Sequence, residues 1–242
     1  MNLIYKNISI HYSSIGKGNA VVLIHGFLEN STMWQGIIPE ISKKYRVICI
    51  DLLGHGKSES IGYIHTMTKQ AEMVKFVLNH LKLRKYTFIG HSMGGYIALA
   101  FSQLYPTNLR GLCLMNSTAL PDTEEKKINR DRGIVAVKQN AKTFVRIAIP
   151  MLFSEKNRTF FTSEIKQEIE EACNIIQDVD ASAASSLKAI TDAGRKDILK
   201  TIHAILRANI GNHSQEVDSL KGFYEAYLAK YQDVYSSHLH SQ

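Results

Sequence analysis

The sequence is poor in long apolar runs and in cysteine, and each shortage excludes a class of protein. No apolar run approaches the roughly 20 residues that span a bilayer, so we predict no transmembrane segment and no membrane partner. The first residues lack the long apolar stretch and the small-residue cleavage site of a signal peptide. The three cysteines are scattered, without the spacing of metal ligands. We therefore expect a cytoplasmic protein that holds no metal and no cofactor.

Basic residues outnumber acidic residues, 29 to 22, but they are dispersed along the chain. Nucleic-acid binding typically needs clustered Lys and Arg with interleaved aromatic residues, whereas small basic groups here lie at 43–44, 84–85 and 126–127. We therefore expect no nucleic-acid partner. The apolar fraction of 45% is ordinary for a globular protein with a full core. Nothing in the sequence indicates an oligomeric state.

Short apolar runs alternate with helix-like segments through the first half of the chain. The runs lie at 20–24, 46–50, 86–89 and 111–115. Continuous apolar runs of this length are typical of strands buried on both faces. Residues 66–83 carry apolar side chains at helical spacing, and a second helix-like stretch, 96–105, stops at Pro106. The alternation predicts an α/β fold with a mostly parallel sheet flanked by helices, opened by a strand or hairpin arm at 3–11.

One serine stands between a predicted strand and a predicted helix, in a turn crowded with glycine. Ser92 lies in residues 90–95, which have the sequence GHSMGG. A strand, a tight turn and a helix around G-x-S-x-G present the serine hydroxyl above the sheet. We expect a strained backbone at the serine, with Gly90 and Gly94 removing collisions beside it. The pattern predicts a nucleophilic serine.

Two further motifs follow predicted strands upstream of Ser92. Residues 25–27 are HGF, and residues 51–58 are DLLGHGKS. With these motifs in this order, the chain resembles the α/β-hydrolase family, which carries H-G, D-x-x-G-x-G-x-S and G-x-S-x-G after successive strands. The resemblance implies a serine hydrolase that cleaves a small ester-like substrate through an acyl-enzyme on Ser92. A catalytically impaired scaffold that binds a ligand or partner is the alternative.

The resemblance also implies a histidine base, because the family order is serine, then acid, then histidine. The tail of the chain offers His238 and His240. A small residue usually precedes the family's histidine, and Ser237 stands before His238. His238 is therefore the predicted base, with His240 as the alternative.

The acidic partner is the largest departure from the family pattern. The family places an aspartate about three residues after a glycine that ends a late strand, but residues 212–214 after Gly211 are Asn, His and Ser. Asp218 is our choice, on a longer loop that brings it back, and Glu216 is an alternative. Asp122, which follows the preceding strand, is a further alternative. A site with no acid stays open too.

The resemblance implies that two backbone amides stabilise the oxyanion of the transition state. Met93 follows the serine, and Phe27 follows the H-G motif. We expect three other polar residues to be structural rather than catalytic, and two of them, His25 and Asp51, match structural positions of the family. We expect His25 and His91 to serve packing and hydrogen bonding, and Asp51 to hold its own loop.

The pattern changes after the fourth apolar run. Residues 121–200 show helical periodicity and no buried strand, and an insertion at this place forms a helical cap in the family. We therefore expect a first core part at 1–120, a cap at 121–200 and a second core part at 201–242. Asp122, with a glutamate three residues later, is expected to cap the first cap helix, and Ser163 the second.

Overall fold

The computed structural model describes residues 1–62, 64–120 and 122–176, and its centre is a six-stranded sheet in the order β1-β2-β4-β3-β5-β6. The strands are β1 (Asn2–Tyr5), β2 (Ile8–Ile15), β3 (Ala20–Ile24), β4 (Arg46–Ile50), β5 (Tyr86–His91) and β6 (Leu109–Met115). The last four strands are parallel, whereas β1 and β2 form an antiparallel hairpin that pairs with β4. The predicted α/β fold is confirmed, and each of the four predicted runs forms a strand. β3, β4 and β5 are buried almost throughout, whereas most residues of β6 are only partly buried.

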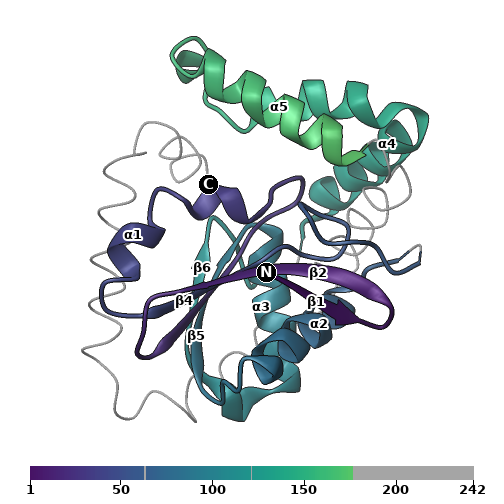
Figure 1. The fold of residues 1–242 in the computed structure, drawn as a ribbon. Helices are drawn as coiled ribbons and strands as arrows, with labels where there is room; N and C mark the ends of the chain where they lie inside the picture. The colour runs from purple at the N-terminus through teal and green to yellow at the C-terminus, as the bar shows by residue number, and fades with distance from the viewer. Residues whose placement is uncertain (63, 121, 177–242) are drawn as a thin grey trace.

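Helices follow the parallel strands and cover both faces of the sheet (Figure 1). They are η1 (Ser31–Trp34), α1 (Ile38–Ile41), α2 (Met67–His80), α3 (Met93–Leu104) and η2 (Pro106–Asn108). The predicted helix at 66–83 is confirmed as α2, which begins after Thr66 because the Thr66 side chain accepts a hydrogen bond from the Lys69 amide. Pro106 stands just beyond α3, as expected of a residue that lacks an N–H donor.

Alternation along the strands divides the core into two clusters. In β3, Val22 and Ile24 point to the face covered by α2 and α3, whereas Val21 and Leu23 point to the face covered by η1 and α1. Both sets are at most 1% exposed. Trp34 is fully buried on the second face. Burial on both faces fixes the register, because a slip of one residue would exchange the two sets.

Two further helices, α4 (Glu124–Met151) and α5 (Thr162–Ile176), form a pair beyond one end of the sheet (Figure 1). The short helix η3 (Glu155–Asn157) connects them. They pack through an apolar seam of their own, made of Val137, Ala141, Val145, Ile149, Ile165 and Ala172. Within 122–176 the structure has no strand, in line with the periodicity of this segment.

The predicted cap residues of these two helices were wrong. Thr123 caps α4, because its hydroxyl oxygen accepts a hydrogen bond from the Lys126 amide. Asp122 lies one residue before this cap, and its carboxylate pairs with Arg130 instead. Ser163 lies inside α5, which begins at Thr162, and its hydroxyl donates to Glu164. In both cases a threonine next to the predicted residue takes the position: Thr123 is the cap of α4, and Thr162 is the first residue of α5.

Asp122 forms an ion pair that joins α4 to the loop before it. Its side chain is 2% exposed, and its two oxygens accept from Arg130 Nε at 2.6 Å and Nη2 at 3.1 Å. Arg130 also acts on Tyr96 of α3, where burial raises the pKa of the phenol and the nearby guanidinium partly offsets that rise. One arginine therefore joins α4, its preceding loop and α3.

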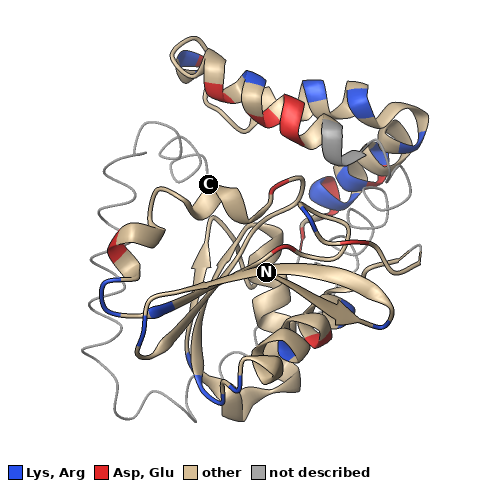
Figure 2. Cartoon of the chain, in the orientation of Figure 1, with Lys and Arg blue, Asp and Glu red and all other residues tan. Residues whose placement is uncertain are grey.

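Charge elsewhere is spread over many elements rather than gathered on one of them. Figure 2 shows Lys and Arg on the loops below the sheet, on α2, and on α4 and α5, where acidic residues are interspersed. Among the helices of residues 1–62, 64–120 and 122–176, none combines the length and the apolar character needed to cross a membrane.

Replacing Arg130 should destabilise the fold more than replacing a neighbouring surface arginine. Arg130→Gln leaves the buried Asp122 carboxylate without its cation, which should cost about 2 kcal/mol of unfolding free energy in urea titrations. Arg132→Gln is the matched control, because Arg132 is exposed on the same helix. The double variant with Asp122→Asn removes both charges and should recover most of the loss. Equal stability of Arg130→Gln and Arg132→Gln would contradict this role.

Candidate active site

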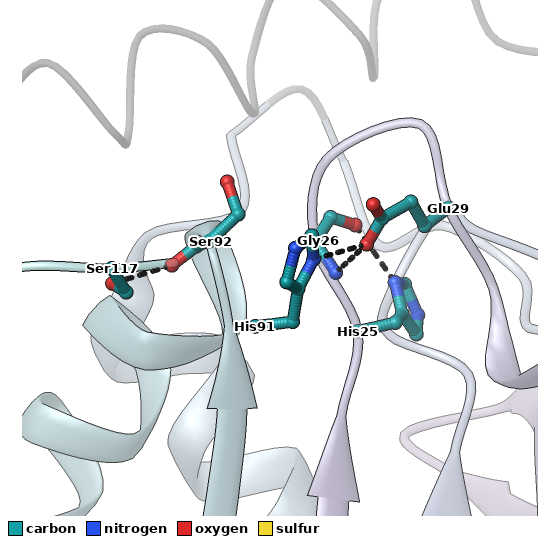
Figure 3. A network of polar contacts seen from close by, with 6 residues as sticks. All are labelled: His25, Gly26, Glu29, His91, Ser92 and Ser117. Carbon is teal, nitrogen blue, oxygen red and sulfur yellow. Dashed lines mark hydrogen bonds and ion pairs between the residues drawn. The ribbon is translucent and has the colours of Figure 1, made fainter. Parts of the chain in front are cut away.

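Ser92 stands in the turn between β5 and α3, with a backbone that serine rarely adopts. Its φ is 50° and its ψ is −116°. Its amide donates to the Met115 carbonyl at 3.0 Å, and its carbonyl accepts from the Ser117 hydroxyl at 2.8 Å. In Figure 3 the Ser92 hydroxyl points away from Ser117 and from the ring of His91. Hydrogen bonds to its backbone hold the turn, and the hydroxyl points away from the strands, beyond the carboxyl end of β5.

Glycine is required on both sides of this turn. A Cβ atom at Gly90 would lie 2.5 Å from the carbonyl oxygen of Gly94. A Cβ atom at Gly94 would collide with the carbonyl oxygen of Ile24 and lie 2.6 Å from that of His25. The expectation of a strained serine between two obligatory glycines is confirmed.

Three residues with left-handed backbones follow three neighbouring parallel strands. They are Leu28 after β3 (φ 62°), Ser92 after β5 (φ 50°) and Asn116 after β6 (φ 48°). The next two strands in the chain, β4 and β5, lie on opposite sides of β3, so the strand order reverses there. Ligands of open α/β sheets bind at such a reversal. Strained backbones gather where a structure holds functional groups in place. The carboxyl end of β3, β5 and β6 is therefore the candidate active site.

His25 is a structural residue, as expected. It is fully buried, and its Nε2 accepts from the Leu52 amide at 3.0 Å. Its other nitrogen, Nδ1, therefore carries the proton and donates to the Gly26 carbonyl at 2.8 Å. Burial lowers the pKa of His25. The neutral ring thus links the end of β3 to the loop after β4.

Asp51 holds the loop that follows β4, also as expected. Its Oδ1 accepts from the Ser31 amide at 2.8 Å and its Oδ2 from the Lys57 amide at 2.9 Å. Its backbone carbonyl accepts from the Ser58 hydroxyl at 2.7 Å. The D-x-x-G-x-G-x-S motif is therefore a loop closed on its own carboxylate.

Glu29 is the residue of this site that sequence reasoning missed. One of its oxygens, Oε2, lies 2.5 Å from the Gly26 amide and 2.9 Å from Nδ1 of His91 (Figure 3). His91 is thus a hydrogen-bonding residue, as predicted. Nothing local in the sequence indicated Glu29, because its partner His91 lies 62 residues away.

Phe27 lies where the sheet, the loops and the helix pair meet. It packs against the core cluster on one side and against the seam of α4 and α5 on the other. Asn30 Nδ2 donates to Glu171 of α5 at 3.5 Å. Burial raises the pKa of Glu168 on α5, and the carboxylates of Glu171 and Glu29 add to the rise. Helix α5 therefore lies against the loop that carries Phe27.

The predicted base and acid fall in a part of the chain that is not described. His238, its alternative His240, Asp218 and Glu216 all lie outside the described residues. Asp122 is described, and both of its oxygens bind Arg130. Within residues 1–62, 64–120 and 122–176, no group of three His, Cys, Asp or Glu side chains is placed to hold a metal ion.

Comparison with known proteins places this geometry among hydrolases. The sequence model of the alpha/beta hydrolase fold matches residues 19–150, which is more than half of the chain. A thermophilic esterase of Thermogutta terrifontis superimposes with a TM-score of 0.69 at 32% identity, over 77% of this chain and 68% of the esterase.

The alignments with curated relatives cover a smaller share of each relative than the alignment with the esterase covers of the esterase. An Escherichia coli 2-hydroxy-6-oxononadienedioate/2-hydroxy-6-oxononatrienedioate hydrolase is 32% identical over 139 residues, 52% of this chain and 48% of the relative. An uncharacterized protein of Mycobacterium tuberculosis is 24% identical over 189 residues, 73% of this chain and 54% of the relative. The chain thus spans about half the length of these curated relatives.

Stability should fall as the pH drops below about 6.5, because three histidines are buried in the neutral form. Burial lowers the pKa of His25, His55 and His65, that of His55 to about 3. Below the ordinary histidine pKa the unfolded chain takes up protons that the folded protein does not. Each such histidine then removes up to about 1.4 kcal/mol of unfolding free energy per pH unit.

Urea unfolding between pH 6.5 and pH 5 measures this slope. His55→Asn keeps a donor for the Leu53 carbonyl, which His55 Nδ1 contacts at 3.0 Å, and should give a shallower slope. His80→Gln is the control, because His80 is exposed. If His55→Asn leaves the pH dependence of the unfolding free energy unchanged, His55 does not contribute to it as a neutral buried histidine.

Proposed function

The chain belongs to the α/β-hydrolase fold family, and on that premise we propose that it is a serine hydrolase acting on a small ester-like substrate. The observation that carries the proposal is Ser92, held left-handed between β5 and α3 with its hydroxyl facing the end of the sheet. Strain of this kind is maintained only when the surrounding structure enforces it. The similar esterase of Thermogutta terrifontis supports an ester as the substrate class.

In the proposed reaction Ser92 Oγ bonds to the carbonyl carbon of the ester. A base takes the hydroxyl proton and passes it to the departing alcohol as the ester C–O bond breaks. A water molecule then attacks the acyl-enzyme, gives its proton to the same base, and releases the carboxylic acid. Serine regains its proton in this last step, so the enzyme returns unchanged.

The negative oxygen of each tetrahedral intermediate would be bound by the amides of Phe27 and Met93. Met93 is the first residue of α3, where N–H groups lack an acceptor within the helix and the helix end favours an anion. Phe27 follows Gly26, whose missing side chain leaves room beside Ser92. Each such donor is typically worth about 3 kcal/mol to the transition state.

The remaining parts of the mechanism are proposals from the sequence. We assign the base to His238 and the acid that orients it to Asp218. We assign the cap to 121–200 and the return to the core to 201–242. The helix pair supports the cap, because its seam packs against Phe27 and Leu28, where it would exclude water from the reacting carbonyl.

A fluorophosphonate probe tests the nucleophile directly. The probe should label Ser92 in folded protein, identified by peptide mapping, and Ser92→Ala should abolish labelling and lower p-nitrophenyl acetate turnover by about a thousandfold or more. Ser42→Ala is the control, because Ser42 follows α1, away from the turn. A folded protein in which Ser92 stays unlabelled would reject the proposal and favour a non-catalytic scaffold.

Substitutions in the tail test the base and the acid. His238→Ala and Asp218→Asn should each reduce turnover by about 10³–10⁴-fold, whereas His240→Ala and Glu216→Gln should have little effect. Steady-state kinetics with the same ester measures all four variants. Loss of activity in His240→Ala or Glu216→Gln instead would move the role to that residue.

A further inference from the structure

The two segments that present the proposed oxyanion amides are joined through one oxygen atom. Glu29 Oε2 accepts from the Gly26 amide at 2.5 Å and from His91 Nδ1 at 2.9 Å (Figure 3). An ionised carboxylate has no proton to give, so His91 is the donor at Nδ1. Gly26 precedes Phe27 in the chain, and His91 lies two residues before Met93. This one oxygen therefore links the two amide-bearing segments.

The surroundings leave this oxygen little freedom. A Cβ atom at Gly26 would lie 2.6 Å from Glu29 Oε2 and 3.1 Å from Ser92 Cβ, so Gly26 separates the carboxylate from the serine. Leu28 adopts φ 62°, which turns the chain so that Glu29 returns to Gly26. The side chains of His91 and Glu29 are 8% and 19% exposed. Hydrogen bonds to an ionised group are strong in such a water-poor place.

We propose that Glu29 is a positioning residue of the oxyanion hole, which holds the Gly26–Phe27 loop against the Ser92 turn through Gly26 and His91. This role rests on the proposed function of Ser92, Phe27 and Met93. Glu29 touches neither the nucleophilic hydroxyl nor a reacting carbonyl and acts through the backbone it fixes. Its loss should therefore weaken binding of the tetrahedral anion more than binding of the ground-state ester.

Two pairs of variants separate the hydrogen bonds from the bulk of the side chains. Glu29→Met and His91→Leu remove the acceptor and the donor at similar size. Glu29→Gln keeps an acceptor oxygen, and His91→Asn keeps an N–H close to the position of Nδ1. Glu59→Met is the matched control, because Glu59 also accepts a backbone amide, that of Ser9 at 2.6 Å, but on the exposed surface.

The readouts are kcat and KM for p-nitrophenyl acetate, and the inhibition constant of phenylboronic acid, which forms a tetrahedral anion on serine. Glu29→Met and His91→Leu should lower kcat and weaken boronate inhibition by about 10–100-fold, with KM changed less than about threefold. Glu29→Gln and His91→Asn should recover much of this loss, and Glu59→Met should match the wild type. If Glu29→Met fails to fold, the His91 pair makes the same test from the donor side.

The outcomes distinguish this role from the underlying function. A wild type that the fluorophosphonate probe labels, with Glu29→Met and His91→Leu unchanged in kcat and boronate inhibition, would overturn only the role of Glu29. Losses that the conservative variants do not reduce would also overturn it, since bulk rather than hydrogen bonding would then matter. A wild type in which Ser92 stays unlabelled would overturn the proposed function itself.

Discussion

The close approach of two backbones, the turn at Ser92 and the end of β3, is the constraint on which the site depends. Gly94 lies so near the carbonyl oxygens of Ile24 and His25 that no side chain fits between them. The turn can therefore lie against β3 only with glycine at this position. Because β3 and β5 are parallel neighbours, the loops after both strands meet at one edge of the sheet. The backbone of Ser92 in this turn has φ 50°, and the serine hydroxyl points away from His91 and Ser117 (Figure 3).

Beneath this end of the sheet, the buried side chains of His25 and Asp51 are both hydrogen-bonded. His25 uses both ring nitrogens, and Asp51 closes its loop through two backbone amides. Polar groups in a place of low dielectric are costly when unpaired and rigid when satisfied. The motifs around the serine thus form a hydrogen-bonded platform, which would suit the proposed oxyanion amides of Phe27 and Met93, because such donors act without rearranging.

The loop after β3 connects this platform to the helix pair. Phe27 packs against the core cluster under α2 and α3 and against the seam of α4 and α5. Glu29 binds the Ser92 turn through His91, and Asn30 contacts α5. Movement of α4 and α5 would therefore act first on the segment that presents the Phe27 amide. The Asp122–Arg130 pair restrains the start of α4 on the core side. The proposed cap and the proposed oxyanion amide of Phe27 therefore meet at this loop.

The sequence by itself determined the parallel strands, helix α2 and the strand–turn–helix around Ser92, because apolar periodicity and glycine spacing act over a few residues. Local reasoning was wrong at Asp122, where a distant arginine and an adjacent threonine decided the outcome. Only the tertiary structure decided the pairing of Glu29 with His91, 62 residues apart. Neither residue has a local signature of that contact, which exists because β3 and β5 lie side by side.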